Sequence, residues 1–437
     1  MNALIINFMM YFVYTILAFK KNQSLNIHNL ISCWFTLIAF FGYLSVATGI
    51  YGQVYGELVT FPIEPYIFAF IAFVIFMLPF KRFNVKDIEL ENFPRIDDKR
   101  INNIAKILIV LFSLYFIVLF SAALHCLSYQ GHEVYEAVHN DGVRLYNFNF
   151  IEEQIFGKIG LIYNSLSSLL LFYCLYSLIL DKKGIYTKRN ILAICLIFAC
   201  ILCGNIAAGA RGGIFFFAIT VSIVIIPFYR YFPKRVKQKF NLLIIVLLGL
   251  FLIYSLAMTI SRFEDSNVES PIESIFRYLG EPFPNLGSQF WNKVRMHPMG
   301  VRMYSTIMQN FLGIASKAQS LGDSHVYWQW VTGVPVLVYK TIWGDFYFEF
   351  GTFIGSLVMG IYVLLLWLFL RKSRAINFFT IPILYYYIEM ATIGPMYFGK
   401  RDEYHTKVLI LCMISCWIIS KLLKNRNNGA EILHKQL

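Results

Sequence analysis

Residues 103–125 read NIAKILIVLFSLYFIVLFSAALH, an apolar run in which Lys106 is the only charged side chain. About 20 apolar residues cross the roughly 30 Å hydrocarbon core of a bilayer when they form a helix. A helix also satisfies its own backbone hydrogen bonds, which lipid cannot do. This stretch is therefore predicted to be a transmembrane helix.

The same pattern recurs along the whole chain and predicts about eleven spanning helices. Residues 261–345 stand out as the one long polar interruption. We see no internal repeat and no inverted pair of broken helices of the kind that marks many transporters. The predicted fold is an all-α polytopic membrane protein with a single integral membrane domain, 1–437, and a large loop at 261–345 that contains short amphipathic helices. The predicted spans are 3–19, 29–50, 63–80, 103–125, 159–180, 191–208, 213–229, 241–260, 346–370, 376–395 and 406–422.

The composition excludes a soluble globular protein. Of 437 residues, 58% are hydrophobic and only 14% are charged, whereas soluble chains carry about 25% charged residues. The first apolar run lacks the basic start and small-residue cleavage site of a signal peptide, so it is interpreted as the first span. The cysteines show no zinc-binding pattern, and neither a metal nor a cofactor is expected.

Basic residues predict the orientation. About 25 of the 38 Lys and Arg residues lie in one set of loops, which marks that side as cytoplasmic. The expected location is the cell inner membrane, with a periplasmic N-terminus, a cytoplasmic C-terminus and the large loop in the periplasm. Anionic membrane lipids at the inner leaflet account for the net charge of +13, so no nucleic-acid partner is needed.

The large loop is predicted to be structured. Ser270 to Glu273 form a capping box with Pro271 at the first helical position, which predicts a short amphipathic helix on the outer membrane surface. A second helical stretch is predicted over 301–312. Residues 326–343 are apolar and aromatic but interrupted by Gly333 and Pro335, which indicates a re-entrant or interfacial segment.

The turn at 208–213, AGARGG, is the most informative short motif. Its small residues let a ligand approach the backbone closely, and Arg211 offers a planar fork for two phosphate oxygens. The alternative interpretation is a tight hairpin whose arginine reaches the lipid headgroups.

Further cations and titratable groups lie in the large loop and just beyond it. Arg295 and Arg302 flank His297, and Arg277 precedes them; these arginines are candidates for binding a diphosphate, or are simply a solvated surface. Asp345 and Glu349 are four residues apart and share a helix face. With His297 and His325 they are the candidate proton acceptors, and Glu389 is a carboxylate deep in a predicted span. For each acid or histidine the alternative is a structural hydrogen bond.

The 209–213 turn, the large loop after the eighth predicted span and the stretch EFGTFIG at 349–355 together resemble the Wzy-type polymerases, which assemble O-antigen and other oligosaccharide repeat units. In that family, and in the related O-antigen ligases, a small-residue turn contributes an arginine to the diphosphate site, which implies this role for Arg211. The resemblance also matches Arg302 and Gly313 to an arginine–glycine pair in a periplasmic loop, and His325 to the histidine that ligases carry there.

The resemblance implies polymerisation of undecaprenyl-diphosphate-linked oligosaccharides into surface polysaccharide. Its implied partners are lipid-linked oligosaccharide substrates, a chain-length regulator and a flippase. Cations would stabilise the leaving diphosphate and a base would activate the acceptor hydroxyl, without a metal. An O-antigen ligase or other lipid-linked glycosyltransferase, a polysaccharide-precursor transporter and a non-catalytic scaffold are the alternatives.

Overall fold

The structure is a computed structural model whose described residues form helices joined by turns, without a β-strand among them. It describes residues 1–22, 25–56, 59–82, 99–129, 133–134, 137, 145–181, 184–209, 212–229, 231–242, 245, 249, 253–254, 271–313, 321–336, 338–372, 380–398, 407–419 and 421. Along the chain its helices are α1 (Asn2–Asn22), α2 (Ile27–Ala47), α3 (Ile50–Tyr55), α4 (Glu64–Met77), η1 (Phe80–Arg82), α5 (Lys99–Cys126), α7 (Phe150–Gln154), η4 (Ile155–Ile159), α8 (Gly160–Leu180), α9 (Thr187–Ala207), α10 (Gly212–Tyr229), α12 (Pro271–Gly280), α13 (Pro282–Asn285), η5 (Leu286–Phe290), α14 (Ser305–Leu312), α15 (Leu321–Thr332), α16 (Thr341–Lys372), α17 (Thr380–Ile393) and a last helix, Lys407–Ile419.

Within the described part of the chain, six helices are long and apolar enough to cross a membrane. They are α1, α2, α5, the continuous helix Phe150–Leu180, α9 and α16. Shorter helices occupy the predicted spans 63–80, 213–229, 376–395 and 406–422. The predicted span 241–260 falls largely outside the described residues, so the total of eleven remains a prediction. The chain is an all-α membrane protein.

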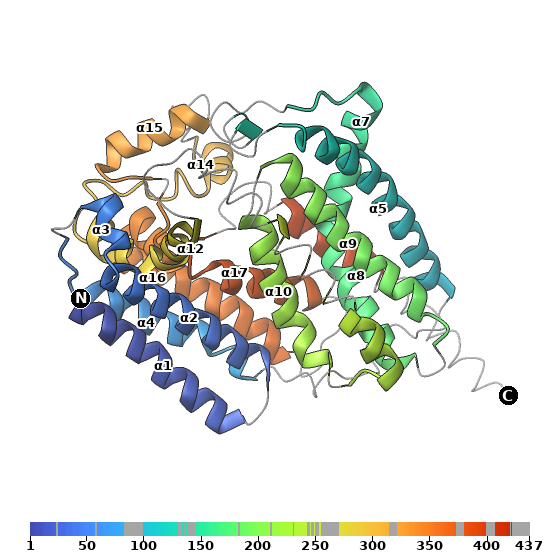
Figure 1. Cartoon of the computed structure of the whole chain (residues 1–437), viewed down its shortest axis with the longest axis horizontal. Helices are drawn as coiled ribbons and strands as arrows, with labels where there is room; N and C mark the ends of the chain where they lie inside the picture. Colours follow the sequence, from blue (N-terminus) through green and yellow to red (C-terminus); the bar gives the residue numbers. More distant parts are fainter. Residues whose placement is uncertain are drawn as a thin grey trace.

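The helices form two groups joined by a central pair (Figure 1). α1, α2, α4 and α16 pack together in one group, and α5, α8 and α9 in the other. α10 and α17 contact each other and connect the groups, because α10 also touches α2 while α17 touches α8 and α16. Apolar side chains such as Ile107, Val110 and Ile117 of α5 face outward, which is the arrangement expected for helices surrounded by lipid.

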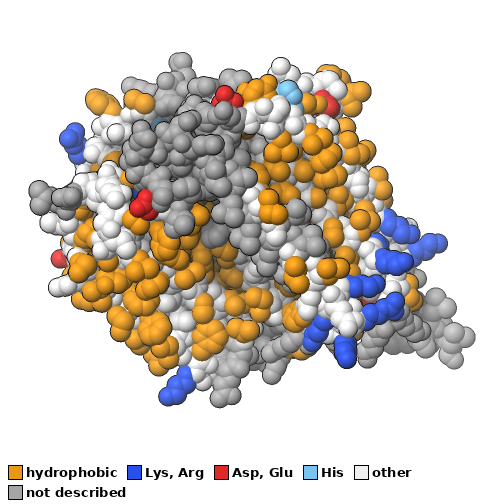
Figure 2. Space-filling model, viewed as in Figure 1, with side chains coloured by type: hydrophobic (Ala, Val, Ile, Leu, Met, Phe, Trp, Pro, Cys, Tyr) orange, Lys and Arg blue, Asp and Glu red, His pale blue; other side chains and the backbone are white. Residues whose placement is uncertain are grey.

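Exposed basic residues gather near the ends of several helices. Figure 2 shows most of the Lys and Arg side chains of this face at the lower right of the molecule, with others at the lower left and the upper left. α1 ends at the bottom of Figure 1 with Lys20 and Lys21, and α9 begins at the lower right with Lys188 and Arg189. The short helices α3, α12, α14 and α15 lie toward the opposite edge (Figure 1).

The helix predicted from the capping box is confirmed as α12, while its position on the outer membrane surface remains a prediction. α12 packs directly along α2 and buries Ser274 and Leu279. At the crossing, a Cβ on Gly280 would lie 2.8 Å from Ser45 Cβ, so only glycine permits this approach. An apolar helix face in the sequence does not reveal whether lipid or another helix covers it.

α16 is interrupted at Gly351, which adopts φ 74° and ψ −175°. This region of backbone space is open essentially to glycine alone. The predicted span 346–370 lies within α16, which the break at Gly351 divides, and residues 341–345 of the predicted loop are also helical. The half-helix 341–350 is buried along its whole length, and the break lies beside the residues described next.

Candidate functional site

The site forms where the turn segment 295–304 crosses the break in α16. A helix that stops leaves its last carbonyl groups without partners in the following turn. Here the His297 imidazole donates from Nδ1 to the Phe348 carbonyl at 2.9 Å, and the Met299 amide donates to the Glu349 carbonyl at 2.8 Å. The segment therefore caps the half-helix 341–350.

This hydrogen bond determines which tautomer the His297 ring adopts. A carbonyl oxygen only accepts hydrogen bonds, so Nδ1 must carry the hydrogen, and in the neutral ring Nε2 is then an acceptor. Nε2 points toward the break, 3.3 Å from the position a Cβ on Gly351 would take. The side chain is only half-buried. His297 is therefore oriented to take a proton from a group that reaches the break.

A buried network of four charges includes Glu349, the residue next to the Phe348 that binds this histidine. Arg302 Nε is 3.1 Å from Glu349 Oε2, and Arg302 Nη2 is 3.5 Å from Asp345 Oδ1. Lys340 Nζ is 3.3 Å from the same Asp345 oxygen. The side-chain exposure is 9% for Arg302, 1% for Lys340 and 0% for each carboxylate. Two cations and two carboxylates thus balance one another out of contact with water.

Backbone amides complete the solvation of both carboxylates. Glu349 Oε1 accepts from the amides of Arg302 and Met303, at 3.1 and 3.0 Å. Asp345 Oδ2 accepts from the Phe398 amide at 2.7 Å, which ties the segment after α17 to α16. A buried ion pair is tolerated only when such additional hydrogen bonds are present.

Aromatic rings cover the apolar side of the same network. The Arg302 guanidinium lies 4.7 Å from the centroid of the Phe348 ring, and Lys340 Nζ lies 4.5 Å from that of Phe290. Trp328 of α15 belongs to the same buried apolar cluster as both rings. Stacking on a ring face stabilises a desolvated cation. This arrangement holds Arg302 and the carboxylates in fixed positions.

The predicted site residues are therefore only partly brought together. His297, Arg302, Asp345 and Glu349 meet at the break, as their spacing suggested for the two acids. The oxygens of the two acids are engaged by cations and amides, so their position suits holding Arg302 better than accepting a proton from a substrate. Of this group, His297 is the residue with access to the surface.

The other predicted arginines occupy different places. Arg295 is exposed, and its side chain lies across Gly333, where a Cβ would be 2.7 Å from Arg295 Cδ. Its amide donates to the Thr332 carbonyl at 2.8 Å. Arg277 of α12 instead pairs at 3.4 Å with Glu281, the residue directly after that helix.

His325 lies half-buried on α15, three residues before Trp328. Arg211 falls outside the described residues. The helix that follows it, α10, brings Phe216 within 6.4 Å of the Tyr397 ring, next to the Phe398 amide that binds Asp345. The start of α10 therefore lies at the same end of the molecule as the break.

Lys340 and Gly351 are functional candidates that the sequence did not single out. In the sequence, Lys340 is one cation among several in the loop. Its position directly before a helix with two acids is the feature that could have identified it as a candidate. Gly351 is one of 27 glycines. No group of three or more His, Cys, Asp or Glu side chains that could hold a metal ion occurs in the described ranges.

Comparison with protein-family models, with curated proteins and with solved structures finds no match to this chain. Function therefore has to be argued from the site itself.

Proposed function

We propose that this chain is a lipid-linked oligosaccharide polymerase of the bacterial inner membrane, with its site at the break in α16. The observation that carries the proposal is the His297 imidazole. It is held in one tautomer by the end of a half-helix, is half-buried with Nε2 facing the break, and lies within a few residues of Arg295 and Arg302.

The reaction needs a base and a stabilised leaving group. His297 Nε2 accepts the proton of the acceptor hydroxyl while that oxygen bonds to the anomeric carbon of the donor glycan. The bond between that carbon and the diphosphate oxygen breaks, and the lipid diphosphate leaves with the electron pair. Exposed Arg295 and the arginine of the 208–213 turn are the cations that would stabilise this charge.

The buried charges play a supporting part in this proposal. Glu349 accepts both the guanidinium and the amide of Arg302, so it fixes the segment that carries His297. Arg302 thus acts as a positioning residue, whereas the sequence had suggested direct contact with the diphosphate. The proposed orientation places the Lys- and Arg-rich edge of Figure 2 in the cytoplasm and the site in the periplasm. The N-terminus is then periplasmic, and eleven spans put the C-terminus in the cytoplasm.

A precursor transporter is the second candidate, because a discontinuous helix at a buried charge cluster is also a feature of secondary transporters. Deletion of the gene separates the candidates. The polymerase predicts surface glycan capped at a single repeat unit. Repeats trapped on the inner leaflet, with no surface glycan, would identify a transporter. Long chains left on undecaprenyl diphosphate would identify a ligase.

Two substitutions test the role of His297 itself. His297→Ala removes both ring nitrogens, whereas His297→Asn keeps a donor that can reach the Phe348 carbonyl but lacks a basic nitrogen. We expect both variants to reach the membrane and neither to make long chains when the polysaccharide is displayed on a gel. Normal chain lengths with His297→Asn would reduce His297 to a helix cap.

A further inference from the structure

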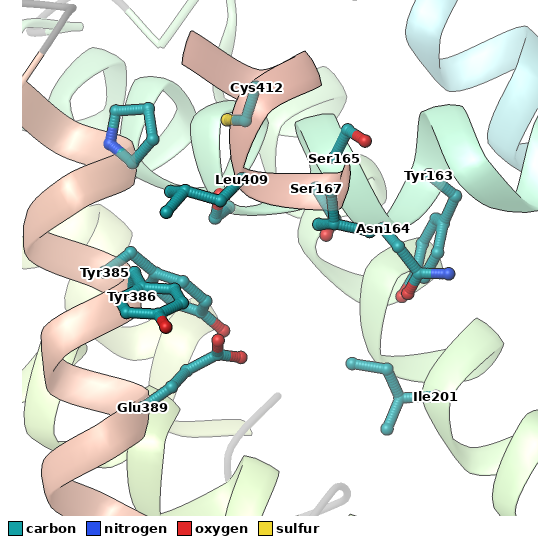
Figure 3. A pocket seen from close by; sticks show the side chains of 13 residues that line it. Tyr163, Asn164, Ser165, Ser167, Ile201, Tyr385, Tyr386, Glu389, Leu409 and Cys412 are labelled. Carbon is teal, nitrogen blue, oxygen red and sulfur yellow. The ribbon is translucent and has the colours of Figure 1, made fainter. Parts of the chain in front are cut away.

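A cavity of about 170 Å³ with both polar and apolar lining lies between α8, α9, α17 and the last helix, and none of its lining residues belongs to the charge network at the break. Figure 3 shows the cavity with the Glu389 carboxylate beside a tyrosine hydroxyl, and Glu389 is hydrogen-bonded to Tyr385. Its polar lining comes mainly from two helices and includes Asn164, Ser165, Ser168, Tyr385, Tyr386 and Glu389. Such a lining is unusual inside a bundle of apolar helices, where ionisable residues mark binding sites or pathways.

The lining of the cavity is rich in acceptors. The Ser165 hydroxyl donates to the Leu161 carbonyl at 2.7 Å, and the Asn164 amide nitrogen donates to the Gly160 carbonyl at 2.9 Å. These donors are used within α8 itself, while a hydroxyl oxygen still has lone pairs and a carboxylate accepts about four hydrogen bonds. A ligand that suits this lining brings donors. A diphosphate does not, because Glu389 would repel it, and a lipid chain has no hydrogen-bonding groups.

The volume of the cavity limits the size of the ligand that can bind in it. An engineered cavity of about 150 Å³ holds a benzene molecule, so 170 Å³ accommodates one six-membered ring. The rings of Tyr163, Tyr385 and Tyr386 border the cavity (Figure 3) and offer apolar faces beside the acceptors. A pyranose ring has this combination of C–H faces and a rim of hydroxyl donors.

Hydroxyl groups connect the cavity to the site at the break. Tyr386 is hydrogen-bonded to Tyr362, and Tyr362 to Tyr304 at 2.9 Å. Tyr304 directly follows Met303, whose amide binds Glu349. Glu389 is four residues before the end of α17, so the cavity lies roughly 6 Å along the helix from the end that leads to Phe398.

We infer that this cavity binds one sugar ring of a glycan through its hydroxyl groups. The identification of that glycan as lipid-linked rests on the proposed function, whereas the sugar ring itself follows from the lining. Sugar in the cavity contacts Tyr386, so occupancy is coupled through Tyr362 and Tyr304 to the segment that carries His297.

Saturation-transfer NMR with free monosaccharides tests this directly. The full chain is purified in a detergent without a sugar headgroup and mixed with hexoses, 6-deoxyhexoses and N-acetylhexosamines in turn. We expect transfer to at least one sugar. Glu389→Gln replaces the charged acceptor by a neutral one, and Tyr385→Phe removes the hydroxyl that is hydrogen-bonded to Glu389. Each should weaken binding about ten- to a hundredfold.

Tyr387→Phe is the matched control. Tyr387 is on the same helix and loses a buried hydroxyl too, but it donates to the Tyr362 carbonyl at 2.6 Å and does not line the cavity. This variant should bind the sugar like the wild type. Ser168→Leu, which fills the cavity without touching Glu389, should abolish transfer and serves if the other variants fail to fold.

Absence of transfer to every sugar in the wild type would overturn the inference, as would equal binding by Tyr387→Phe and the cavity variants. Protection against heating by Na⁺ that depends on Glu389, without sugar binding, would identify a cation site instead. These outcomes can be told apart from those of the polymerase test. If gene deletion abolishes long chains but no sugar shows saturation transfer, only the assignment of the cavity is contradicted.

Discussion

Gly351→Ala tests whether the break in α16 is built into the protein. Gly351 has φ 74° and ψ −175°, a conformation that costs a residue with a Cβ about 1–3 kcal/mol. The new methyl group would also lie 3.3 Å from His297 Nε2, a tight contact that the half-buried ring relieves by moving. We therefore expect a loss of stability of about 1–3 kcal/mol, together with shortened polysaccharide chains, because the base is displaced.

Gly360→Ala is the matched control on the same helix. A Cβ there meets nothing within 4 Å, and alanine is favoured over glycine in a helix by about 0.5–1 kcal/mol. Unfolding by SDS titration of the purified protein should therefore shift in opposite directions for the two variants. Gly351→Ala as stable as Gly360→Ala, with normal chains, would show that α16 runs straight and that the cap by His297 does not exist.

Three further predictions concern the charges and the topology. Arg302→Met leaves two buried carboxylates without their shared cation and should lower the stability of the protein by about 3–5 kcal/mol. Arg295 is exposed, so Arg295→Met should change the stability by less than about 0.5 kcal/mol. Equal stabilities of the two variants in the same SDS titration would contradict the buried network. Arg211→Lys keeps the charge but loses the planar fork, so it should restore only part of the chain length that Arg211→Ala abolishes; full restoration would make Arg211 a headgroup anchor. Reporter fusions after Tyr231 and Leu437 should report cytoplasm and one near Gly287 periplasm, and a cytoplasmic signal at Gly287 would place the site on the wrong side.

Most of the helices could be predicted from the sequence because lipid imposes a simple requirement of length and apolarity. The run 103–125 lies within α5, and the capping box at 270–273 marks the start of α12. The pairing of Asp345 with Glu349 on one face also follows from helical spacing alone. These features depend on residues close together in the chain.

The features that the sequence did not reveal depend on distant contacts. Glu349 and Arg302 are 47 residues apart, and no local pattern links them. Gly351 and Gly360 look alike within an apolar run, yet only Gly351 meets His297 and leaves the helical conformation. The cavity beside Glu389 forms where four helices meet. The sequence shows only that Glu389 is a carboxylate within a predicted span.

The break in α16 also has a consequence for how the chain enters the membrane during synthesis. An aspartate at the centre of an inserting helix costs roughly 2.5–3.5 kcal/mol, so the half-helix 341–350, with two carboxylates, cannot stand alone in lipid. The half beyond Gly351 is apolar and outward-facing, with Phe353, Leu357 and Ile361 exposed. Biogenesis therefore favours an order in which the second half inserts by itself and the first half folds in late, once Arg302 and the adjacent Lys340 pack against its carboxylates. A protein that lacks either cation should accumulate as an inserted but unfinished intermediate, open to proteases at the segment before Thr341.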